Sequence, residues 1–500
     1  MGPTAGPGMR PVYHFSVPDN WKNDPQRPVY VAGEYLYYYL YNADYVVGGT
    51  GTAWRLATTR DHVSFEDRGV AIPKSTNANG DCWSGSVVVD EHGTAGRGAG
   101  AVFALVTQNP GGQQAQFLWC STDGGRSFTA DGLDPVLPNP GVADFRDPKV
   151  IRDDERDRWV MALAEGSRIG FYASTDLRAW AFVGEFVPAA LGVLECPDLF
   201  RMTADDGSSH WVLGLSPLSL GRSHPATYAY WTGDFDGSRF TADREQPDWL
   251  DWGFDFYGAV TYPHHLPSGA EDPGLRRAIG WANAWLYAHN TPTLASDGRN
   301  GDDSIVRELR LRRGDGEYYL ASAPPAALAD RVTCVHRLGD VEVGGAATGG
   351  IQDLGIRSPS YDLTCELEWD AAAPPGDIGF EVLRPPGGGR QLTLGAHLHG
   401  PPEGGPSDRG PSAGRPHVYV DRWRTANPAG GRSQTPLDPA AGRLALRLLV
   451  DRTSVELFVG DGRVVHSHRV FPLDADDGIR LCVRDGTAVF RDLTVREIGP

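Results

Sequence analysis

The chain is poor in basic charge and in long apolar segments. Its 46 lysines and arginines face 64 aspartates and glutamates, which gives a formal net charge of −18. Nucleic acids and anionic membrane surfaces repel such a polyanion, so the composition disfavours both as partners. No run of about 18 apolar residues occurs, and the sequence therefore predicts no membrane-spanning helix.

Cysteine is also scarce, and its spacing carries no metal signature. The six cysteines are Cys82, Cys120, Cys196, Cys334, Cys365 and Cys482. They form neither a Cys-x-x-Cys pair nor a zinc-type pattern, and the 14 histidines are scattered. Motifs for zinc proteases, serine hydrolases and phosphate-binding loops are missing as well. We therefore expect free thiols, no metal and no cofactor.

The first residues, MGPTAGPGMRPVYHF, lack the apolar core of a signal peptide. This fits either a cytoplasmic protein or a mature form whose leader is missing from the sequence. The sequence leaves both alternatives open.

Glycine, proline and aromatic residues are abundant instead. The sequence has 63 Gly, 38 Pro, 14 Trp, 18 Tyr and 18 Phe, which is typical of a turn-rich all-β chain. Most of the aromatic rings fill β cores, and some offer flat faces on which sugars stack. Five hundred residues exceed one ordinary core, so two domains are expected.

A short polar turn followed by an aromatic residue recurs in the first two thirds of the chain. Its marker aspartates are Asp61, Asp123, Asp176 and Asp236, about 50 to 60 residues apart. Short Val-, Tyr-, Phe- and Trp-rich runs lie between them, as in four-stranded propeller blades. A fifth unit begins near residues 255–257, and the pattern predicts a five-bladed β-propeller over residues 12–325.

The pattern changes after a linker predicted at residues 321–327. Alternation with a period of two follows, in Leu444, Leu446, Leu448 and Val450 and then in Val455, Leu457 and Val459. The turn at residues 460–462 predicts a hairpin. We expect a β-sandwich domain over residues 340–500, with a mobile Gly- and Pro-rich loop at residues 400–414.

Three carboxylates occupy an early position in successive propeller units. They are Asp24 in WKNDPQRP, Asp147 in FRDP and Glu195 in GVLECPDLF; Ser84 in WSGS has the same phase. The first strands of propeller blades line the central channel, so these side chains can converge on one pocket. Taken singly, the two aspartates are ordinary turn residues and Glu195 is as readily structural as functional.

Together, the three carboxylates are what acid–base chemistry on a glycosidic bond requires. Burial of Glu195 in an apolar run would raise its pKa and suit a general acid. Arg146 would favour the ionised form of the adjacent Asp147. Asp24, held extended by Pro25, would be an ionised nucleophile.

These motifs resemble those of glycoside hydrolase family 32, the retaining enzymes that cleave β-fructofuranosides. Trp21-x-Asn23-Asp24-Pro25 is similar to its nucleophile motif, residues 145–148 to its transition-state-stabiliser motif, and residues 195–197 to its acid/base motif. Residues 83–86 are similar to its fructose-binding motif. Residues 305–309 and 449–458 resemble further landmarks of the family.

The resemblance implies a five-bladed propeller with a C-terminal β-sandwich, and hydrolysis through a fructosyl-Asp24 intermediate. The substrate-binding residues that it implies are Asn23, Trp54, Trp83, Ser84, Arg146 and Trp285. The sequence departs from the usual family motifs at Gln26-Arg27-Pro28, Tyr38-Tyr39-Leu40, Leu56 and Ala284. These departures bear on substrate preference rather than on the chemistry.

The main hypothesis is a secreted, extracellular bacterial fructan β-fructosidase of the levanase type, which cuts the β-2,6 linkages of levan and releases fructose or short fructo-oligosaccharides. Inulin and sucrose are further candidate substrates. One alternative is a levan fructotransferase, in which a sugar hydroxyl replaces water and a difructose anhydride or oligosaccharide forms. Another is a catalytically inactive fructan-binding propeller.

Overall fold

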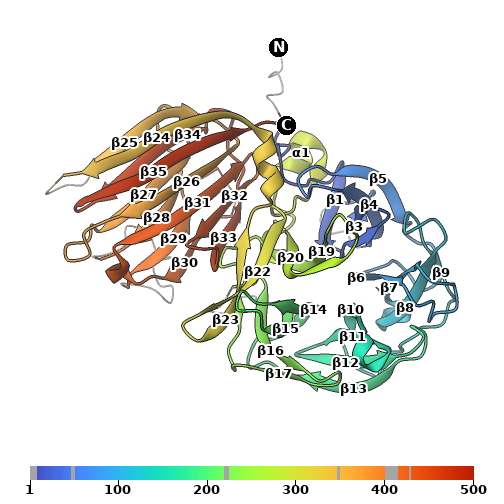
Figure 1. The fold of residues 1–500 in the computed structure, drawn as a ribbon. Helices are drawn as coiled ribbons and strands as arrows, with labels where there is room; N and C mark the ends of the chain where they lie inside the picture. Colours follow the sequence, from blue (N-terminus) through green and yellow to red (C-terminus); the bar gives the residue numbers. More distant parts are fainter. Residues whose placement is uncertain (1–7, 47–50, 219–224, 346–349, 400–414, 427–428) are drawn as a thin grey trace, which may run out of the picture.

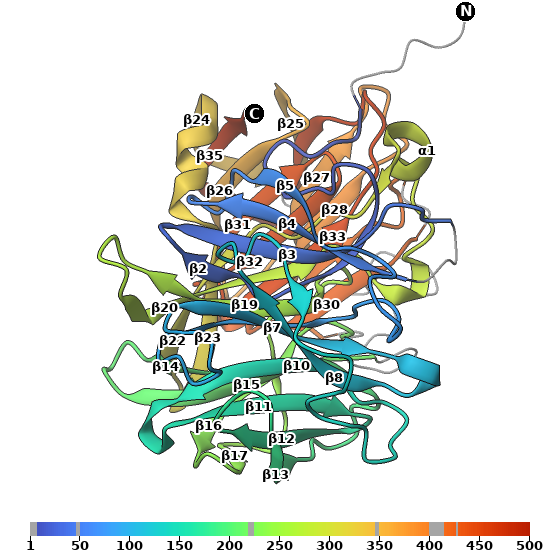
Figure 2. The same cartoon turned by 90° about the vertical axis from the view of Figure 1, so that its right-hand side faces the viewer.

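Two β architectures follow one another along the chain (Figure 1). The computed structural model describes residues 8–46, 51–218, 225–345, 350–399, 415–426 and 429–500. Five sheets form a ring, and two six-stranded sheets lie face to face beside it (Figure 1). In the view turned by 90°, the propeller strands lie in front of the sandwich strands (Figure 2). The predicted five-bladed propeller and C-terminal sandwich are confirmed. The predicted loop at residues 400–414 lies outside the described residues.

The propeller sheets succeed one another in sequence order. Blade I contains β1 (Asn20–Pro25), β2 (Val29–Val31), β3 (Glu34–Asn42), β4 (Ala53–Thr59), β5 (Glu66–Ile72) and β21 (Arg299–Asn300). Blade II contains β6 (Gly85–Asp90), β7 (Ala101–Gln108), β8 (Ala115–Ser121) and β9 (Thr129–Ala130). Blade III contains β10 (Arg146–Asp153), β11 (Arg158–Glu165), β12 (Arg168–Ser174) and β13 (Ala181–Phe186).

The last two blades complete the ring. Blade IV contains β14 (Leu194–Thr203), β15 (Ser209–Pro217), β16 (Ala229–Phe235), β17 (Phe240–Ala242) and β18 (Asp248–Trp249). Blade V contains β19 (Tyr257–His265), β20 (Glu271–Trp281), β22 (Arg307–Gly314) and β23 (Glu317–Ala323). Strand β21 pairs in parallel with β1, so a late segment of the propeller joins the first blade to the last.

The repeated aspartates form the turns between the two outer strands of blades I to IV. In each turn the aspartate Oδ1 accepts two backbone N–H groups two to four residues later. A short acidic side chain can satisfy turn donors in this way without help from the rest of the fold. The aspartate recurs because each of these turns needs an acceptor for its backbone N–H groups. This requirement is local, so the repeat is visible in the sequence.

Aromatic and aliphatic side chains pack between neighbouring blades. One core cluster, which includes Trp54 and Trp119, joins blades I and II. Another, which includes Phe171 and Trp231, joins blades III and IV. Because each blade buries both faces, the inner ends of the strands are held rigidly around the centre of the ring.

Helical structure is short in the described residues. It comprises η1 (Pro110–Gly112), η2 (Asp154–Arg156), η3 (Trp285–Tyr287), α1 (Thr293–Asp297), η4 (Ala326–Arg331) and η5 (Pro439–Ala441). None of the helices in these residues is long and apolar enough to cross a membrane. The predicted linker at 321–327 is mostly ordered, because β23 continues to Ala323 and η4 starts at Ala326. Leu328 anchors η4 in a core cluster between the domains.

The sandwich buries the alternating residues that predicted it. One sheet contains β24 (Val332–Gly344), β35 (Thr487–Ile498), β26 (Tyr361–Glu368), β31 (Arg443–Asp451), β32 (Ser454–Val459) and β33 (Val464–Arg469). The other contains β25 (Gly350–Arg357), β34 (Gly478–Arg484), β27 (Asp377–Arg384), β28 (Leu392–His397), β29 (His417–Asp421) and β30 (Arg432–Pro436). All seven apolar residues of the predicted alternation lie in the core between the sheets, and the predicted hairpin joins β32 to β33.

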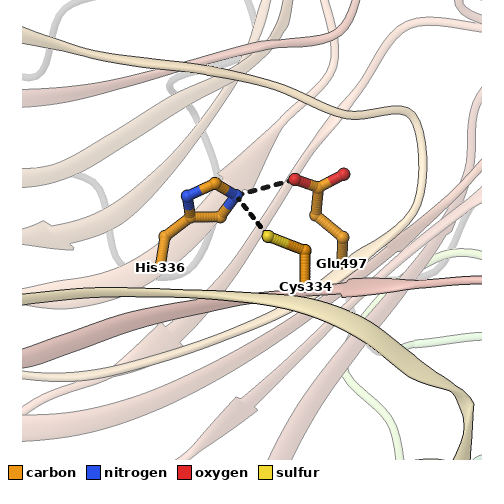
Figure 3. Close-up of side chains that lie close together, drawn as sticks. All are labelled: Cys334, His336 and Glu497. Carbon is orange, nitrogen blue, oxygen red and sulfur yellow. Dashed lines mark hydrogen bonds and ion pairs between the residues drawn. The ribbon is translucent and has the colours of Figure 1, made fainter.

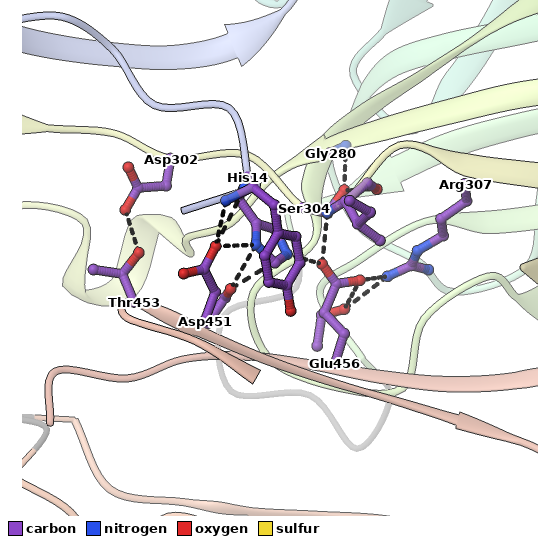
Figure 4. A network of polar contacts seen from close by, with 12 residues as sticks. His14, Gly280, Asp302, Ser304, Arg307, Asp451, Thr453 and Glu456 are labelled. Atoms are coloured by element: carbon purple, nitrogen blue, oxygen red, sulfur yellow. Dashed lines mark hydrogen bonds and ion pairs between the residues drawn. The ribbon is translucent and has the colours of Figure 1, made fainter. Parts of the chain in front are cut away.

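A buried polar network joins the two domains (Figure 4). Asp451 of the sandwich accepts the backbone N–H groups of Val12, Tyr13 and His14. The ring of His14 lies between two carboxylates, with Nδ1 2.9 Å from Asp451 and Nε2 3.1 Å from Glu456. Burial lowers the pKa of His14, but these contacts outweigh it and raise the pKa to about 9.

The same carboxylate holds the fifth blade. Glu456 accepts the backbone N–H of Ile305 at 2.7 Å and the guanidinium of Arg307 at 3.1 Å. Arg307 also pairs with Asp251 at 2.5 Å. The two family landmarks at residues 305–309 and 449–458 are therefore the two sides of one interdomain contact.

Candidate active site

The innermost strands of three blades carry the predicted carboxylates. Asp24 lies on β1, Asp147 on β10 and Glu195 on β14. A register shift interrupts the strand pairing at each of them, between Lys22 and Pro25, Arg146 and Lys149, and Glu195 and Asp198. Such bulges re-aim side chains that regular alternation would point into the sheet.

Two residues at the bulges have backbone angles that L-amino acids rarely adopt. The φ angle is 63° at Asp147 and 50° at Cys196, directly after Glu195. A non-glycine residue with positive φ is strained, and such strain gathers at functional sites. The surrounding blades hold this geometry in place.

Asp24 sits at the floor of the candidate site. Its Oδ2 accepts a hydrogen bond from Ser84 Oγ at 2.7 Å, and its Oδ1 accepts one from Asn23 Nδ2 at 3.2 Å. A Cβ atom on Gly258 would lie 3.1 Å from Oδ1, so only glycine fits there without displacement. Burial, and then the charge of Asp147, raise the pKa of Asp24 to about 6.

Asp147 is fixed between two other blades. Its backbone N–H donates to Thr107 Oγ1 of blade II at 3.0 Å, and its Oδ2 accepts the backbone N–H of Cys196 of blade IV at 3.0 Å. The thiol of Cys196 is 3.8 Å from Asp147 Oδ2 and 4.0 Å from Asp24 Oδ2. The two carboxylates therefore share one neighbouring atom, which puts both at the same point of the channel.

Glu195 completes the group. Its Oε1 accepts two hydrogen bonds from Arg146, from Nε at 3.1 Å and from a terminal nitrogen at 2.9 Å. Its Oε2 accepts the hydroxyl of Tyr257. Burial and then the charge of Asp147 raise the pKa of Glu195 to about 7, although Arg146 and Tyr257 act in the opposite direction. Burial acts to lower the pKa of Arg146, and the charge of the adjacent Asp147 acts to raise it, as the sequence led us to expect. The guanidinium also donates hydrogen bonds to Asp144 and Gln114.

Gln26 helps to position Ser84, a role that the sequence did not indicate. It is fully buried, and its side-chain oxygen accepts the N–H of Gly85 at 2.7 Å. Its amide nitrogen donates to Ser84 Oγ at 3.3 Å and to the carbonyl of Asp24 at 3.2 Å. Gln26 therefore orients the serine that binds the Asp24 carboxylate. Gln26 therefore also places a side-chain amide next to Asp24.

Arg27, another departure from the usual motif, spans the channel. Its guanidinium donates to the carbonyl of Gly85 at 2.7 Å and to the carbonyl of Pro197 at 2.5 Å. It ties the nucleophile strand to the segment that carries Glu195. Further along the same inner strands, a separate hollow is lined in part by Arg27, Lys149 and Arg276.

The predicted binding residues differ in whether they contact the three carboxylates. Asn23, Ser84 and Arg146 contact the carboxylates directly. Trp285 is 37% exposed and lies against Trp21 and Trp281.

The two remaining tryptophans differ in exposure. Trp83 is half-buried, but Trp54 has no exposed surface. The indole N–H of Trp54 donates to the carbonyl of Trp83 at 3.0 Å. In this structure Trp54 therefore supports Trp83 from the core between the blades and offers no face to a sugar.

Among the described residues, the group of side chains that could hold a metal ion is Cys334, His336 and Glu497. It lies on strands β24 and β35 of the sandwich and not at the candidate site. The chemistry available at the carboxylates is proton transfer and nucleophilic attack by the chain's own groups.

Comparisons with known proteins cover both domains. The pattern described as "Glycosyl hydrolases family 32 N-terminal domain" matches residues 14–324, and that described as "Glycosyl hydrolases family 32 C terminal" matches residues 334–497. A levanbiose-producing levanase of Bacillus subtilis is 45% identical over 497 residues, which is 98% of this chain and 91% of that protein. One of Geobacillus stearothermophilus is 49% identical over 349 residues, 69% of this chain and 86% of that protein.

A solved structure agrees with this assignment. The crystal structure of an exo-inulinase from Aspergillus awamori has a TM-score of 0.82 and 25% identity, and covers 99% of both chains. Matches to both family domains across nearly the whole chain, together with the three converging carboxylates, give one conclusion. The chain belongs to glycosyl hydrolase family 32.

Proposed function

We propose that this enzyme hydrolyses the β-2,6 linkages of levan and releases levanbiose, with catalysis in the propeller at residues 12–325. The observation that carries the proposal is the meeting of Asp24, Asp147 and Glu195 around Cys196, with the pKa of Glu195 at about 7 and that of Asp24 at about 6. The names of the two levanbiose-producing relatives support levan as substrate and levanbiose as product.

The environments of two carboxylates support different roles for them. Near neutral pH most of Asp24 is ionised and can attack the anomeric carbon of a fructosyl unit. Glu195 retains its proton over part of the same range and can donate it to the departing glycosidic oxygen. The C–O bond breaks as the fructosyl–Asp24 ester forms, and the leaving sugar departs as an alcohol.

The second step regenerates the enzyme. Glu195, now ionised, removes a proton from water, and the water oxygen attacks the anomeric carbon and displaces Asp24. In this proposal Asp147 and Arg146 bind fructose hydroxyl groups, and the carboxylate of Asp147 stabilises the positive charge that develops on the ring. Asn23, Trp83, Ser84 and Trp285 are the further binding residues of the proposal, and Trp54 acts through Trp83.

Secretion is also part of the proposal. A polymer such as levan is met outside the cell, and an exo-inulinase of Aspergillus niger that is 29% identical over 509 residues is named as extracellular. Fractionation of the producing culture tests this, since activity confined to washed cells would contradict it.

Parallel digestion of levan, inulin and sucrose tests the function. We expect levan to be consumed fastest and levanbiose to dominate the products, while an Asp24→Asn variant gives none. A cyclic difructose anhydride as main product would refute hydrolysis in favour of transfer. If the wild-type protein binds levan but yields no product, it is a binding propeller instead.

A further inference from the structure

Three potential metal-ligating side chains meet at the edge of one sheet of the sandwich, in residues that the function does not use (Figure 3). Cys334 and His336 lie two residues apart on β24, so their side chains project from the same face of the strand. Glu497 of β35 is the direct cross-strand partner of Cys334. Figure 3 shows the thiol, imidazole and carboxylate turned toward one another.

The Sγ–Nε2 distance matches a small tetrahedral ion, and the Nε2–Oε1 distance is shorter than the tetrahedral edge. Cys334 Sγ is 3.6 Å from His336 Nε2, and with Zn–S and Zn–N bonds of about 2.3 and 2.0–2.1 Å a tetrahedral S–N edge is about 3.6 Å. His336 Nε2 is 2.7 Å from Glu497 Oε1, and the corresponding tetrahedral edge is about 3.4 Å. The three ligand atoms all lie within 4.8 Å of one another.

The remaining adjustment is small. Glu497 has a half-buried side chain with about a third of its surface exposed, so its carboxylate can retreat without repacking a core. Cys334 is exposed, which leaves an entry path for the ion and room for a water molecule as fourth ligand. A thiolate, an imidazole and a carboxylate together favour Zn²⁺ over Ca²⁺ or Mg²⁺, which prefer oxygen alone.

We propose that Cys334, His336 and Glu497 form a surface Zn²⁺ site that fastens β24 to β35. Strand β24 is the edge of its sheet and the first strand after the propeller, and β35 is the last strand of the sandwich. The ion would link His336 and Glu497, which are 161 residues apart in sequence. It would thereby stabilise β24, an edge strand that has a hydrogen-bonded neighbour strand on one side only. Sequence inspection for paired cysteines misses this site, because its third ligand is recruited by strand pairing.

Titration of the metal-free full-length protein with Zn²⁺ against a chromogenic chelator tests the site. We expect one equivalent to bind, and affinity to fall by more than about tenfold in each of Cys334→Ser, His336→Gln and Glu497→Gln, because even an outer-shell partner is worth about 10–100-fold. Added Zn²⁺ should raise the melting temperature of the wild type and not of these variants. Co²⁺ should give the sulfur-to-metal charge-transfer band, and Cys334→Ser should remove it.

His92→Gln is the matched control, since His92 faces Asp154 at 3.8 Å on the propeller surface without a thiol. It should bind Zn²⁺ as the wild type does. The proposal is overturned if no equivalent binds in competition with the chelator, if the three variants bind as tightly as the wild type, or if the Co²⁺ band is absent. Because none of these readouts uses hydrolysis, they are independent of the proposed function.

Discussion

Replacing Tyr257 with phenylalanine removes one hydroxyl from the Glu195 carboxyl group and leaves the aromatic ring in place. The Tyr257 hydroxyl donates to Oε2, and this bond lowers the pKa of Glu195 against the larger effects of burial and of Asp147. Its loss therefore disfavours the ionised form, so the pKa of Glu195 should rise above its present value of about 7.

The size of the shift follows from the strength of the bond. A hydrogen bond to a charged group contributes about 1.5–3 kcal/mol, and about 1.4 kcal/mol corresponds to one pKa unit. We therefore expect an increase of roughly one to two units. A general acid works only while protonated, so the alkaline limb of the rate profile should move to higher pH by the same amount.

The assay is kcat/KM for levan hydrolysis across the neutral and alkaline range, which reports groups of the free enzyme. Tyr39→Phe is the control: Tyr39 is buried on β3, and its hydroxyl has no hydrogen-bond partner among the described residues. Its profile should match that of the wild type. An alkaline limb that stays in place in Tyr257→Phe, or moves to lower pH, would refute the reasoning.

Four further outcomes are expected. Asp24→Asn should lower kcat on the order of 10⁴-fold while binding of levan oligosaccharides changes little, and retained turnover would eliminate the nucleophile assignment. Gln26→Leu should lower the unfolding free energy by about 1–3 kcal/mol and reduce kcat, because buried partners lose their hydrogen bonds; a wild-type kcat would contradict its positioning role. Trp285→Ala should raise KM with kcat nearly unchanged, which steady-state kinetics with levan oligosaccharides can check. Folding raises the pKa of His14 from 6.5 to about 9, so the protonated ring stabilises the folded protein by on the order of 3 kcal/mol. This stabilisation is complete below pH 6.5 and is lost as the pH rises through about 9. The urea midpoint of the wild type should therefore fall over that range, and an equal fall in His14→Asn would exclude this histidine as the cause.

Turn residues and short-range burial patterns were enough to predict the propeller and the sandwich from the sequence. The blade turns depend on one aspartate that satisfies nearby backbone N–H groups, so the repeat was visible without any tertiary contact. In the sandwich, the alternating apolar residues of β31 and β32 fill the core between the sheets, while Leu449 and Phe458 on the opposite face pack toward the propeller. The shared phase of Asp24, Asp147 and Glu195 predicted a common pocket, since a ring of blades brings equivalent positions together.

Contacts between distant segments could not be predicted in the same way. The sequence predicted the interaction of Arg146 with the adjacent Asp147, but not the hydrogen bond from its guanidinium to Glu195 on the next blade. Trp54 was expected to bind sugar, and packing between blades I and II buries it completely. Tyr257 and Gln26 carry no local signature, because their importance comes from the carboxyl group or serine that they meet after folding.

By itself the sequence determined the all-β class, the five-fold repeat, the sandwich and the identity of three acidic side chains, because turn chemistry and burial patterns act over a few residues. Only the tertiary structure decided which charges pair and how far each pKa moves. Those properties depend on bulges, strand register and burial, which are set by residues from 49 to 172 positions apart, and no short segment encodes them.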